Sequence, residues 1–529
     1  MKSPVNYVVI GAGINGLTVA CELAMAGHSV TLIESTNRLG GFIDSGERTL
    51  PGYVHDTYSS WHPLFVSGGA YAALGPSLHR HGLEYLNTDD AVTASVSGDD
   101  RVAIAYRDVQ KTASALELAQ DQDAYLAMLA DLGRNADLAF GALGTELRSP
   151  RSLSLALKML RRNKIAGSEH FARESLMSGR AFLRNKFDGW DVDQLWSPWL
   201  LHAGLGPDHT TGGVMLPIMA MSMHNFGLPI VAGGAAHFVS AFSRILEENG
   251  VEIKLGNPVD SIILDKGRAV GVRVAGETVM ATRGVIASVT PGALYENLLP
   301  EASVSPQVKH EVSRYRPGRG AMQIHVALDR PVQWSDSRLN NVPLIHVTDG
   351  TGSTGIACAQ AEAGLLPADP TIVVGQQYVL DPSRVPEGAG SLWLQLQEVP
   401  FAPRGDAGGE LDVSSGWTET LKQQYCDRVL RSLERHAPGL TSSILATEII
   451  SPLDLLSANS NATDGDPYGG SAELHQNLLW RPTPSTSRHK SVIPGLWHIG
   501  ASTHPGPGLG GGSGHLAAQL ILRGRARRP

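Results

Sequence analysis

The chain has 529 residues, of which 42% are hydrophobic and 18% are charged, a composition typical of globular proteins. This length is too great for one compact core, so two or three structural regions are expected. A net charge of −8 argues against a general nucleic-acid binder. The three cysteines lack the spacing of metal ligands or of a disulfide framework, which suits a reducing compartment such as the cytoplasm.

The strongest motif stands in the first forty residues. Tyr7–Ile10 is an apolar run typical of a buried strand, and Gly11-Ala12-Gly13-Ile14-Asn15-Gly16 follows it. A helical pattern then runs to Gly27, and a second apolar strand, His28–Ile33, ends at Glu34. Strand, glycine motif, helix, strand and acid come in the order that a dinucleotide-binding site requires.

Each residue type in this motif has a physical reason. Gly11 permits the tight turn out of the strand, Gly13 lets the backbone approach a pyrophosphate, and Gly16 lets helix and strand pack closely. The helix that opens at Ile14-Asn15 presents unpaired N–H groups and a positive dipole end to phosphates. Glu34 can accept hydrogen bonds from a ribose 2′-hydroxyl.

The segment after Glu34 favours FAD over NAD. Ser35-Thr-Asn-Arg38 leads to the doublet Gly40-Gly41, which can bring the backbone close to a second phosphate. Arg38 can pair with the pyrophosphate charge. FAD lies extended across its domain and needs contacts beyond the first turn, so we predict that this whole segment contacts the cofactor.

Pro51–Phe65 holds an unusual number of rings and titratable groups for a loop-like stretch. It is either a surface loop with a packed Trp61 or a segment beside the flavin ring. In the second case His55 and Asp56 are candidate catalytic residues.

Residues 108–184 are predicted to be largely helical, because Ala, Leu, Glu and Arg dominate there. Leu153–Ile165 combines an apolar face with four basic residues, and the chain closes on the basic segment Arg523–Arg528. Both features are typical of solvated faces, and both also suit peripheral contact with an anionic membrane. No signal peptide is apparent, and no apolar run approaches the roughly 18 residues of a spanning helix.

Trp190–Phe226 is rich in Trp and Met, which either fill a core or line a pocket for an apolar ligand. Farther along, Met322–Leu328 and Ser391–Glu398 are predicted strands, and leucines alternate with other residues in the second.

Pro229–Leu294 is predicted to return to the cofactor domain. Gly233-Gly234 precedes a helix over 236–249. Strands are predicted at 251–255, 259–264, 269–274, 277–281 and 284–287, and the last of them ends at Ser288.

A glycine-rich motif lies near the end of the chain: Gly500-Ala501-Ser-Thr-His504-Pro-Gly-Pro-Gly-Leu-Gly510-Gly511-Gly512-Ser513. It follows a predicted strand and leads into a helix over 515–523. Such a loop suits close backbone approach to a large flat or anionic ligand. His504 is a candidate base because the pKa of histidine lies near the working pH. For His504, His55 and Asp56 a structural hydrogen-bonding role is the alternative.

Taken together, these motifs resemble the phytoene desaturase family, within the larger amine-oxidase-like FAD superfamily. Phe42 after the glycine doublet and Thr57 after Asp56 place the chain nearer the pyridine-nucleotide-disulphide-oxidoreductase-like branch. The resemblance implies non-covalent FAD and an adenine contact through the backbone of Val259. It also implies that Gly500-Ala501 and Gly510–Ser513 lie near the pyrophosphate, the ribityl chain and the flavin ring edge.

The expected fold is therefore α/β. A discontinuous Rossmann-type FAD-binding domain is expected over residues 1–88, 229–296 and 485–529. A largely helical substrate or lid region is expected over 89–228, and an α+β substrate-binding sheet domain over 297–484.

The favoured function is an FAD-dependent desaturase or dehydrogenase that transfers a hydride from an apolar or ring-containing small molecule to flavin N5. One alternative is a flavin-dependent amine oxidase or a redox-neutral isomerase. Another is a non-catalytic binder of prenylated proteins, as in the Rab GDP-dissociation inhibitors, which resemble this fold. The expected partner is a small molecule rather than nucleic acid, and no metal is expected.

Overall fold

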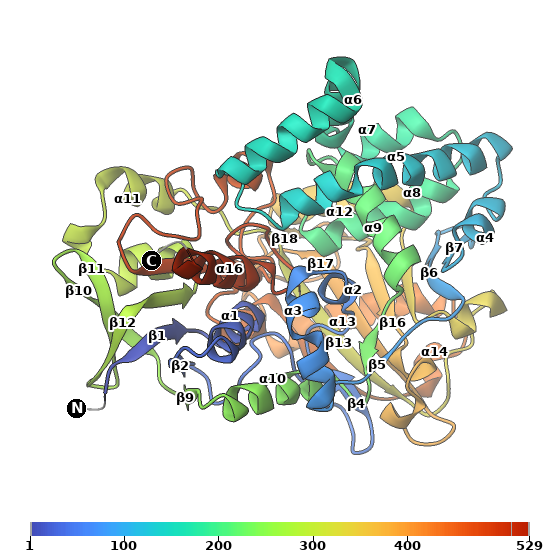
Figure 1. The fold of residues 1–529 in the computed structure, drawn as a ribbon. Coiled ribbons are helices and arrows are strands. Elements are labelled where there is room, and N and C mark those ends of the chain that lie inside the picture. The colour runs from blue at the N-terminus through green and yellow to red at the C-terminus, as the bar shows by residue number, and fades with distance from the viewer. Residues whose placement is uncertain (1–2, 509, 527–529) are drawn as a thin grey trace.

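A computed structural model describes residues 3–508 and 510–526 of the chain. Figure 1 shows two sheets beside each other, with a group of helices over the second. The first sheet lies on the side of the two termini, and the second is built mainly from the later half of the chain. This arrangement confirms the predicted α/β fold class.

The first sheet has seven strands that come from distant parts of the chain. Five of them run parallel in the order β20-β12-β1-β2-β9, as a Rossmann-type sheet requires. The other two form an antiparallel extension with the first half of β12. The strands are β1 (Val5–Ile10), β2 (Val30–Ile33), β9 (Glu252–Lys254), β10 (Val259–Asp265), β11 (Arg268–Val274), β12 (Glu277–Ser288) and β20 (Leu496–Ile499).

The strand β12 corrects one prediction. Residues 277–281 and 284–287 were predicted as separate strands, but they form one strand of 12 residues. Gly284, which suggested a break, lies inside the strand. A Cβ atom there would lie 2.3 Å from the carbonyl oxygen of Gly495, so the glycine allows close approach of a neighbouring turn.

Both faces of the first sheet are covered, which explains the unbroken apolar run of β1. Tyr7 and Val9 pack against a helical layer, and Val8 and Ile10 pack against the antiparallel extension. The helical layer consists of α1 (Ile14–Met25), α3 (Gly69–Arg80), α10 (Ala236–Glu248) and α16 (Gly512–Ala526).

The second sheet also has seven strands, in the order β19-β13-β17-β16-β14-β6-β7. Its last two strands, β6 and β7, differ from the prediction, which placed residues 91–106 in the largely helical region. Five of the six residues of Ala91–Val96 are buried, and this segment pairs with β14 as a strand. The strands are β6 (Ala91–Val96), β7 (Val102–Tyr106), β13 (Gly320–Leu328), β14 (Leu344–Val347), β16 (Ile372–Gly375), β17 (Gly390–Val399) and β19 (Ile444–Ile450).

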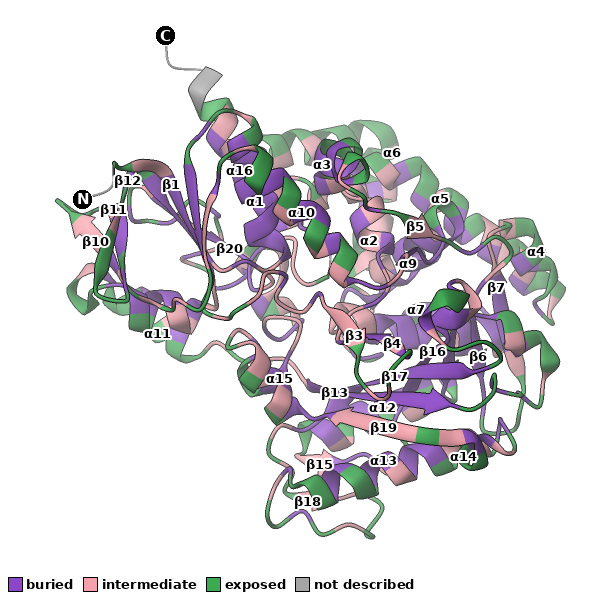
Figure 2. Cartoon of the chain, turned by 90° about the horizontal axis from the view of Figure 1, so that it is seen from below, coloured by how far each residue is buried: buried purple, intermediate pink, exposed green. Residues whose placement is uncertain are grey.

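The two faces of the second sheet differ in character. Leu392, Leu394 and Leu396 of β17 face a dry core beneath α13 (Glu419–Glu434), as their alternation predicted. Trp393 and Gln395 lie on the opposite face and line a cavity. Figure 2 shows β13 and β17 buried along their length.

The predicted helices over 108–184 are confirmed, and α6 projects from the rest of the molecule (Figure 1). Among the described residues, no helix is long and apolar enough to cross a membrane. The helices of this region are α4 (Val109–Ser114), α5 (Ala119–Leu143), α6 (Pro150–Leu176), α7 (Gly179–Lys186), α8 (Asp191–Trp196), η1 (Ser197–Ala203) and α9 (Gly212–Phe226). Shorter elements that matter below are β3 (Ser45–Glu47), β4 (Val54–Asp56), α2 (Pro63–Val66), β8 (Ile230–Val231), η5 (Gln377–Val379), η6 (Pro382–Arg384) and α12 (Gly350–Glu362).

Candidate active site

A cavity extends from the first sheet to the second sheet and the helical region. Part of its wall comes from four segments that are far apart in the sequence and that meet at the carboxyl ends of β1, β12 and β20. Ligands of open parallel sheets bind at this edge. The predicted cofactor residues in this wall are Gly13, Ile14, Asn15, Gly40, Gly41, Ser288, Gly500 and Ala501.

The three glycines of the N-terminal motif have different surroundings. A Cβ atom at Gly13 would meet no protein atom within 4 Å, so this position is open. A Cβ at Gly16 would lie 1.9 Å from the carbonyl oxygen of Gly11, and one at Gly11 would lie 2.9 Å from that of Ser288. Gly11 and Gly16 therefore serve backbone packing, whereas Gly13 leaves room for a ligand at the N-terminus of α1. No side chain caps that helix end.

Glu34 lies at the end of β2 and fixes the glycine turn. Its Oε2 accepts the backbone N–H of Ala12 at 2.7 Å, and its Oε1 accepts the hydroxyl of Ser35 at 3.1 Å. Oε1 also accepts the N–H and the hydroxyl of Thr36, whereas Oε2 accepts only Ala12 within the described residues, so Oε2 is the oxygen that can still accept a ligand hydroxyl. The backbone N–H of Asn257 donates to the Glu34 carbonyl at 2.9 Å, which places the start of β10 at Val259 close to Glu34.

Arg38 supports the glycine doublet. Its Nη2 donates to the Gly41 carbonyl at 2.7 Å, and its guanidinium lies 5.7 Å from the ring centre of Tyr58. Gly40 and Gly41 have φ angles of 107° and 60°, which favour glycine. Arg38 is not part of the cavity wall, so its contacts indicate a role in holding the doublet.

Four residues of the closing motif, Gly510, Gly511, Gly512 and Ser513, do not line the cavity. The hydroxyl of Ser513 bonds to Thr503 at 2.6 Å and accepts the N–H of Gly500 at 3.2 Å. Asn15 accepts the N–H of Gly514 at 3.1 Å, and so joins α1 to α16. A Cβ at Gly511 would lie 2.6 Å from the Thr18 hydroxyl. Gly510, Gly511 and Gly512 thus form the tight entry to α16 that holds Gly500 in place.

None of the three candidate catalytic residues lines the cavity. The Nε2 of His504 bonds to the carbonyl of Ala142 at 3.0 Å, and burial lowers the pKa of His504 to about 4. The Nε2 of His55 bonds to the Thr49 hydroxyl at 3.0 Å, and burial lowers the pKa of His55 to about 3. The carboxylate of Asp56 forms an ion pair with Arg384. These contacts favour the structural alternative for all three side chains.

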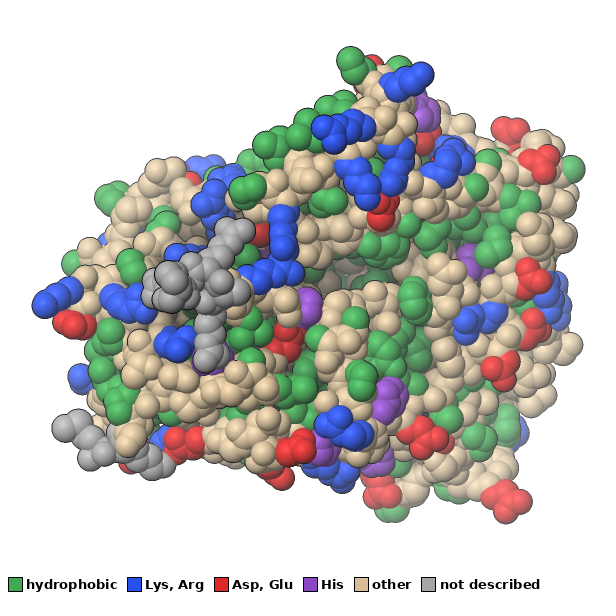
Figure 3. All heavy atoms as spheres, in the orientation of Figure 1, with side chains coloured by type: hydrophobic (Ala, Val, Ile, Leu, Met, Phe, Trp, Pro, Cys, Tyr) green, Lys and Arg blue, Asp and Glu red, His purple; other side chains and the backbone are tan. Residues whose placement is uncertain are grey.

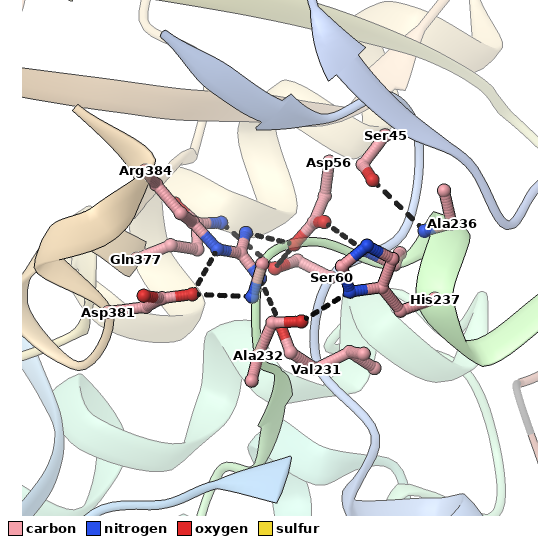
Figure 4. A network of polar contacts seen from close by, with 12 residues as sticks. Ser45, Asp56, Ser60, Val231, Ala232, Ala236, His237, Gln377, Asp381 and Arg384 are labelled. Carbon is pink, nitrogen blue, oxygen red and sulfur yellow. Dashed lines mark hydrogen bonds and ion pairs between the residues drawn. The ribbon is translucent and has the colours of Figure 1, made fainter. Parts of the chain in front are cut away.

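The ion pair of Asp56 belongs to a buried network that joins β4 and β8 to η6 (Figure 4). Asp56 Oδ2 lies 2.8 Å from Arg384 Nη1, and Arg384 Nε lies 3.2 Å from Asp381 Oδ2. Asp56 Oδ1 accepts the N–H of Ala235 at 2.7 Å. Gln377 donates to the Ser60 hydroxyl at 3.1 Å, so the network also holds a residue of the cavity wall.

Pro51–Phe65 is therefore not a surface loop. His55, Asp56 and His62 are buried, and residues 58–61 line the cavity. The alternative interpretation, a segment beside the flavin ring, stays a prediction.

The rest of the cavity wall includes residues that the sequence analysis did not single out. Trp199 and His202 come from η1, and Gln323 and Gln395 come from facing strands of the second sheet. The alternation of β17 was a usable signal, because its leucines belong to the core and so send Gln395 to the other face. The wall on this side also contains Trp61, Met219, Ser222, Met223, Trp393, Gln397 and Tyr468.

The Trp- and Met-rich segment serves both of the roles that were predicted for it. Met219, Met223 and Trp199 contact the cavity, whereas Trp196 is fully buried in the core. Met219, Met223 and Trp199 belong to the same core cluster as Trp196, so these three residues both pack in the core and line the cavity.

His202 forms a pair with a second histidine behind the cavity wall. Its Nε2 lies 3.1 Å from the Nε2 of His346, and its ring stacks on Trp199 with centres 4.5 Å apart. Burial lowers the pKa of His202 to about 3 and that of His346 well below its usual value. Both rings are therefore neutral at pH 7. In the hydrogen bond between them, one Nε2 donates its proton and the other Nε2 accepts it.

Comparisons with known proteins identify the family of the chain. The family described as flavin containing amine oxidoreductase matches residues 14–522. The chain is 24% identical to pyridine nucleotide-disulfide oxidoreductase domain-containing protein 2 of Rattus norvegicus, over 99% of this chain and 94% of that protein. It is 23% identical to a 4,4'-diapophytoene desaturase of Staphylococcus aureus, over 95% of each.

Solved structures show the same fold. An oxidoreductase from Methanosarcina mazei has a TM-score of 0.62 and 15% identity, with 98% of this chain and 100% of that chain covered. Cyclohexylamine oxidase from Brevibacterium oxydans has a TM-score of 0.60 and 15% identity, with 99% and 100% covered. The chain thus belongs to the flavin containing amine oxidoreductase family and is an FAD-dependent oxidoreductase, as its motifs predicted.

Proposed function

We propose that the four converging segments hold FAD. Gly13 and the N-terminus of α1 would receive the pyrophosphate, and Glu34 would accept the ribose hydroxyls. The open position at Gly13 is the observation that supports this assignment. Bound FAD supplies a hydride acceptor at flavin N5. The protein has to orient the substrate and keep water out.

For the reaction, we propose a dehydrogenase or desaturase that removes a hydride from an uncharged, ring-containing small molecule. The single observation that carries this proposal is the composition of the cavity wall. Among the described residues that line it, Asp466 is the only Asp, Glu, Lys or Arg, and its carboxylate accepts the N–H groups of Gly318, Tyr468 and Gly470. Tryptophan and methionine surround the remaining space, which suits a flat and largely apolar ligand.

Reduction of the bound flavin under anaerobic conditions tests this proposal. The holoenzyme is mixed with cyclic ketones, cyclic alkenes and primary amines of matched ring size, and bleaching of the flavin absorption is followed. We expect ketones or alkenes to reduce the flavin fastest. A protein that is reduced by amines alone contradicts the proposal.

Amine oxidation is the second candidate. The family name and the fold shared with putrescine oxidase and cyclohexylamine oxidase favour it. In the same experiment, repeated in air, release of hydrogen peroxide with a primary amine would support an oxidase. A redox-neutral isomerase would convert its substrate with no net flavin reduction.

We also propose that α6 contacts an anionic membrane surface. Leu153, Leu157 and Leu160 follow one face of this helix, and each is between 45% and 63% exposed. Arg151, Arg161 and Lys164 are exposed beside them, and no ion pair involves them among the described residues. Figure 3 shows apolar and basic side chains together on α6.

This combination of exposed leucines and unpaired basic side chains is typical of helices that lie in the lipid interface. The basic C-terminal segment was the other predicted contact. Arg527 and Arg528, with the side chain of Arg525, lie outside the described residues.

A further inference from the structure

The face of the second sheet that lines the cavity contains amide groups with unused hydrogen-bonding capacity. Gln323 and Gln395 are direct neighbours across β13 and β17, and Gln397 follows on β17. All three line the cavity and are at most 9% exposed. A buried amide without partners is costly, so such groups normally indicate a missing partner.

The three amides differ in what they already bind. Gln323 donates to the carbonyl of Tyr58, and Gln397 donates to the hydroxyl of Tyr468. The Oε1 atoms of both side chains are buried without a partner among the described residues. The side chain of Gln395 makes no hydrogen bond at all within the described part of the chain, so its donor and its acceptor are both free.

Aromatic rings surround these amides. Trp61, Trp199 and Trp393 line the same cavity, and His202 stacks on Trp199. Within the described residues, the indole N–H groups of all three tryptophans are buried without partners. Flat rings of this kind bind planar ligands through their faces.

Charge is nearly absent from this wall. His202 is neutral for the reason given above, and the carboxylate of Asp466 is occupied by backbone N–H groups. A cationic ligand would find no free carboxylate, and an anionic ligand would find no Lys or Arg in the wall. A plain hydrocarbon would leave the free amide of Gln395 buried without a partner.

We propose that this part of the cavity binds a neutral planar ring that carries a carboxamide or lactam group, and that Gln395 pairs with that group. An amide offers one donor and one acceptor side by side, which matches the free donor and acceptor of Gln395. This inference rests on the proposed function, since it names the substrate class of the same site.

The test uses four probes that share one ring: benzamide, benzoate, benzylamine and toluene. Their binding to the purified holoenzyme is measured by titration calorimetry, and the flavin absorption of the same sample is recorded. We expect benzamide to bind at least about tenfold more tightly than the other three, because each of them leaves the Gln395 amide unmatched. Equal or tighter binding of toluene contradicts the proposal, and so does failure of all four probes to bind.

Variants of Gln395 test whether its amide group causes the preference for benzamide. Gln395→Leu should weaken benzamide at least about tenfold without weakening toluene. Gln395→Glu should shift the preference toward benzylamine, because it places a carboxylate in the cavity. Gln423→Leu, on the exposed face of α13, is the matched control and should change neither affinity. Unchanged benzamide affinity in Gln395→Leu contradicts the proposal.

The flavin absorption of the same sample distinguishes failure of the proposed substrate class from failure of the proposed function. A protein that holds FAD but shows no preference for benzamide refutes only the substrate class. A protein that retains no FAD refutes the proposed function itself.

Discussion

Gly13 is the residue whose surroundings link the sequence motif to the cofactor. Gly11 and Gly16 are glycines because protein atoms crowd them, whereas Gly13 faces open space. The motif alone does not separate these roles, since the three glycines look equivalent in the sequence. Only the packing of α1 against β1 and β12 shows which one faces a ligand.

Replacement of Gly13 by valine should abolish retention of FAD. The φ angle of Gly13 is −67°, so valine fits the backbone, and its side chain would project into the place assigned to the pyrophosphate. The measurement is the ratio of flavin to protein absorption after gel filtration. Gly352→Val on α12 is the control, because it also projects into open space but lies away from the cavity. A Gly13→Val protein with full flavin content would contradict the assignment.

At the scale of elements, η6 is connected to β4 by a buried ion pair. Arg384 is 1% exposed and lies between Asp56 and Asp381. Its Nη2 also donates to the carbonyl of Val231 in β8. One side chain thus joins η6 to both β4 and β8.

Arg384→Met should lower the free energy of unfolding by about 3–5 kcal/mol, because it leaves Asp56 and Asp381 buried without a cation. The change is measured as a fall in Tm. Arg134→Met removes an exposed ion pair with Asp131 and should cost at most about 1 kcal/mol. Equal Tm values for the two variants would show that the buried pair is not structurally important.

The helix α6 carries a prediction of its own. Changing Leu153, Leu157 and Leu160 together to serine should reduce binding to vesicles of phosphatidylcholine and phosphatidylglycerol several-fold, as measured by cosedimentation. Leu445→Ser removes a leucine of similar exposure on β19 and serves as the control. The proposed contact is refuted if the native protein does not cosediment with these vesicles, or if the triple variant binds as well as the native protein.

At the scale of the whole molecule, buried histidines make the fold sensitive to acid. Burial lowers the pKa of His55 and His202 to about 3, and that of His62, His498 and His504 to about 4. In the unfolded chain these groups take up protons near pH 6.5, whereas in the folded chain they stay neutral until far lower pH. Below pH 6.5 the unfolded state therefore binds more protons than the folded state, and the free energy of unfolding decreases as the pH is lowered.

We expect Tm to be nearly constant from pH 8 to 7 and to fall steadily from pH 6.5 to 5. His202→Gln should reduce this slope, because glutamine does not titrate. Gln423→Leu on the exposed face of α13 removes no titratable group, so it is the control and should leave the slope unchanged. A Tm that does not change between pH 7 and 5 would contradict this account.

Local order along the chain was enough to predict the cofactor and the fold class. Tyr7–Ile10, the glycine motif and Glu34 are consecutive, so their chemistry can be recognised without knowledge of distant contacts. The middle and closing contributions to the first sheet could also be predicted, because each combines glycines with a helix and apolar strands. The boundary of the helical region was wrong, since the partner of Ala91–Val96 is β14, about 250 residues later.

The substrate side of the site was decided by tertiary structure. Gln395 and His202 belong to no local motif, and they meet Trp199 only because β17 and η1 pack against each other beside one cavity. The candidate catalytic residues show the reverse case. His504, His55 and Asp56 lie in or beside recognisable motifs, yet none of them lines the cavity. His504 and His55 bond to Ala142 and Thr49, and Asp56 pairs with Arg384 and accepts the hydroxyl of Ser60. Sequence order determines which backbone can approach a cofactor, whereas side-chain direction depends on packing between segments that are distant in the chain.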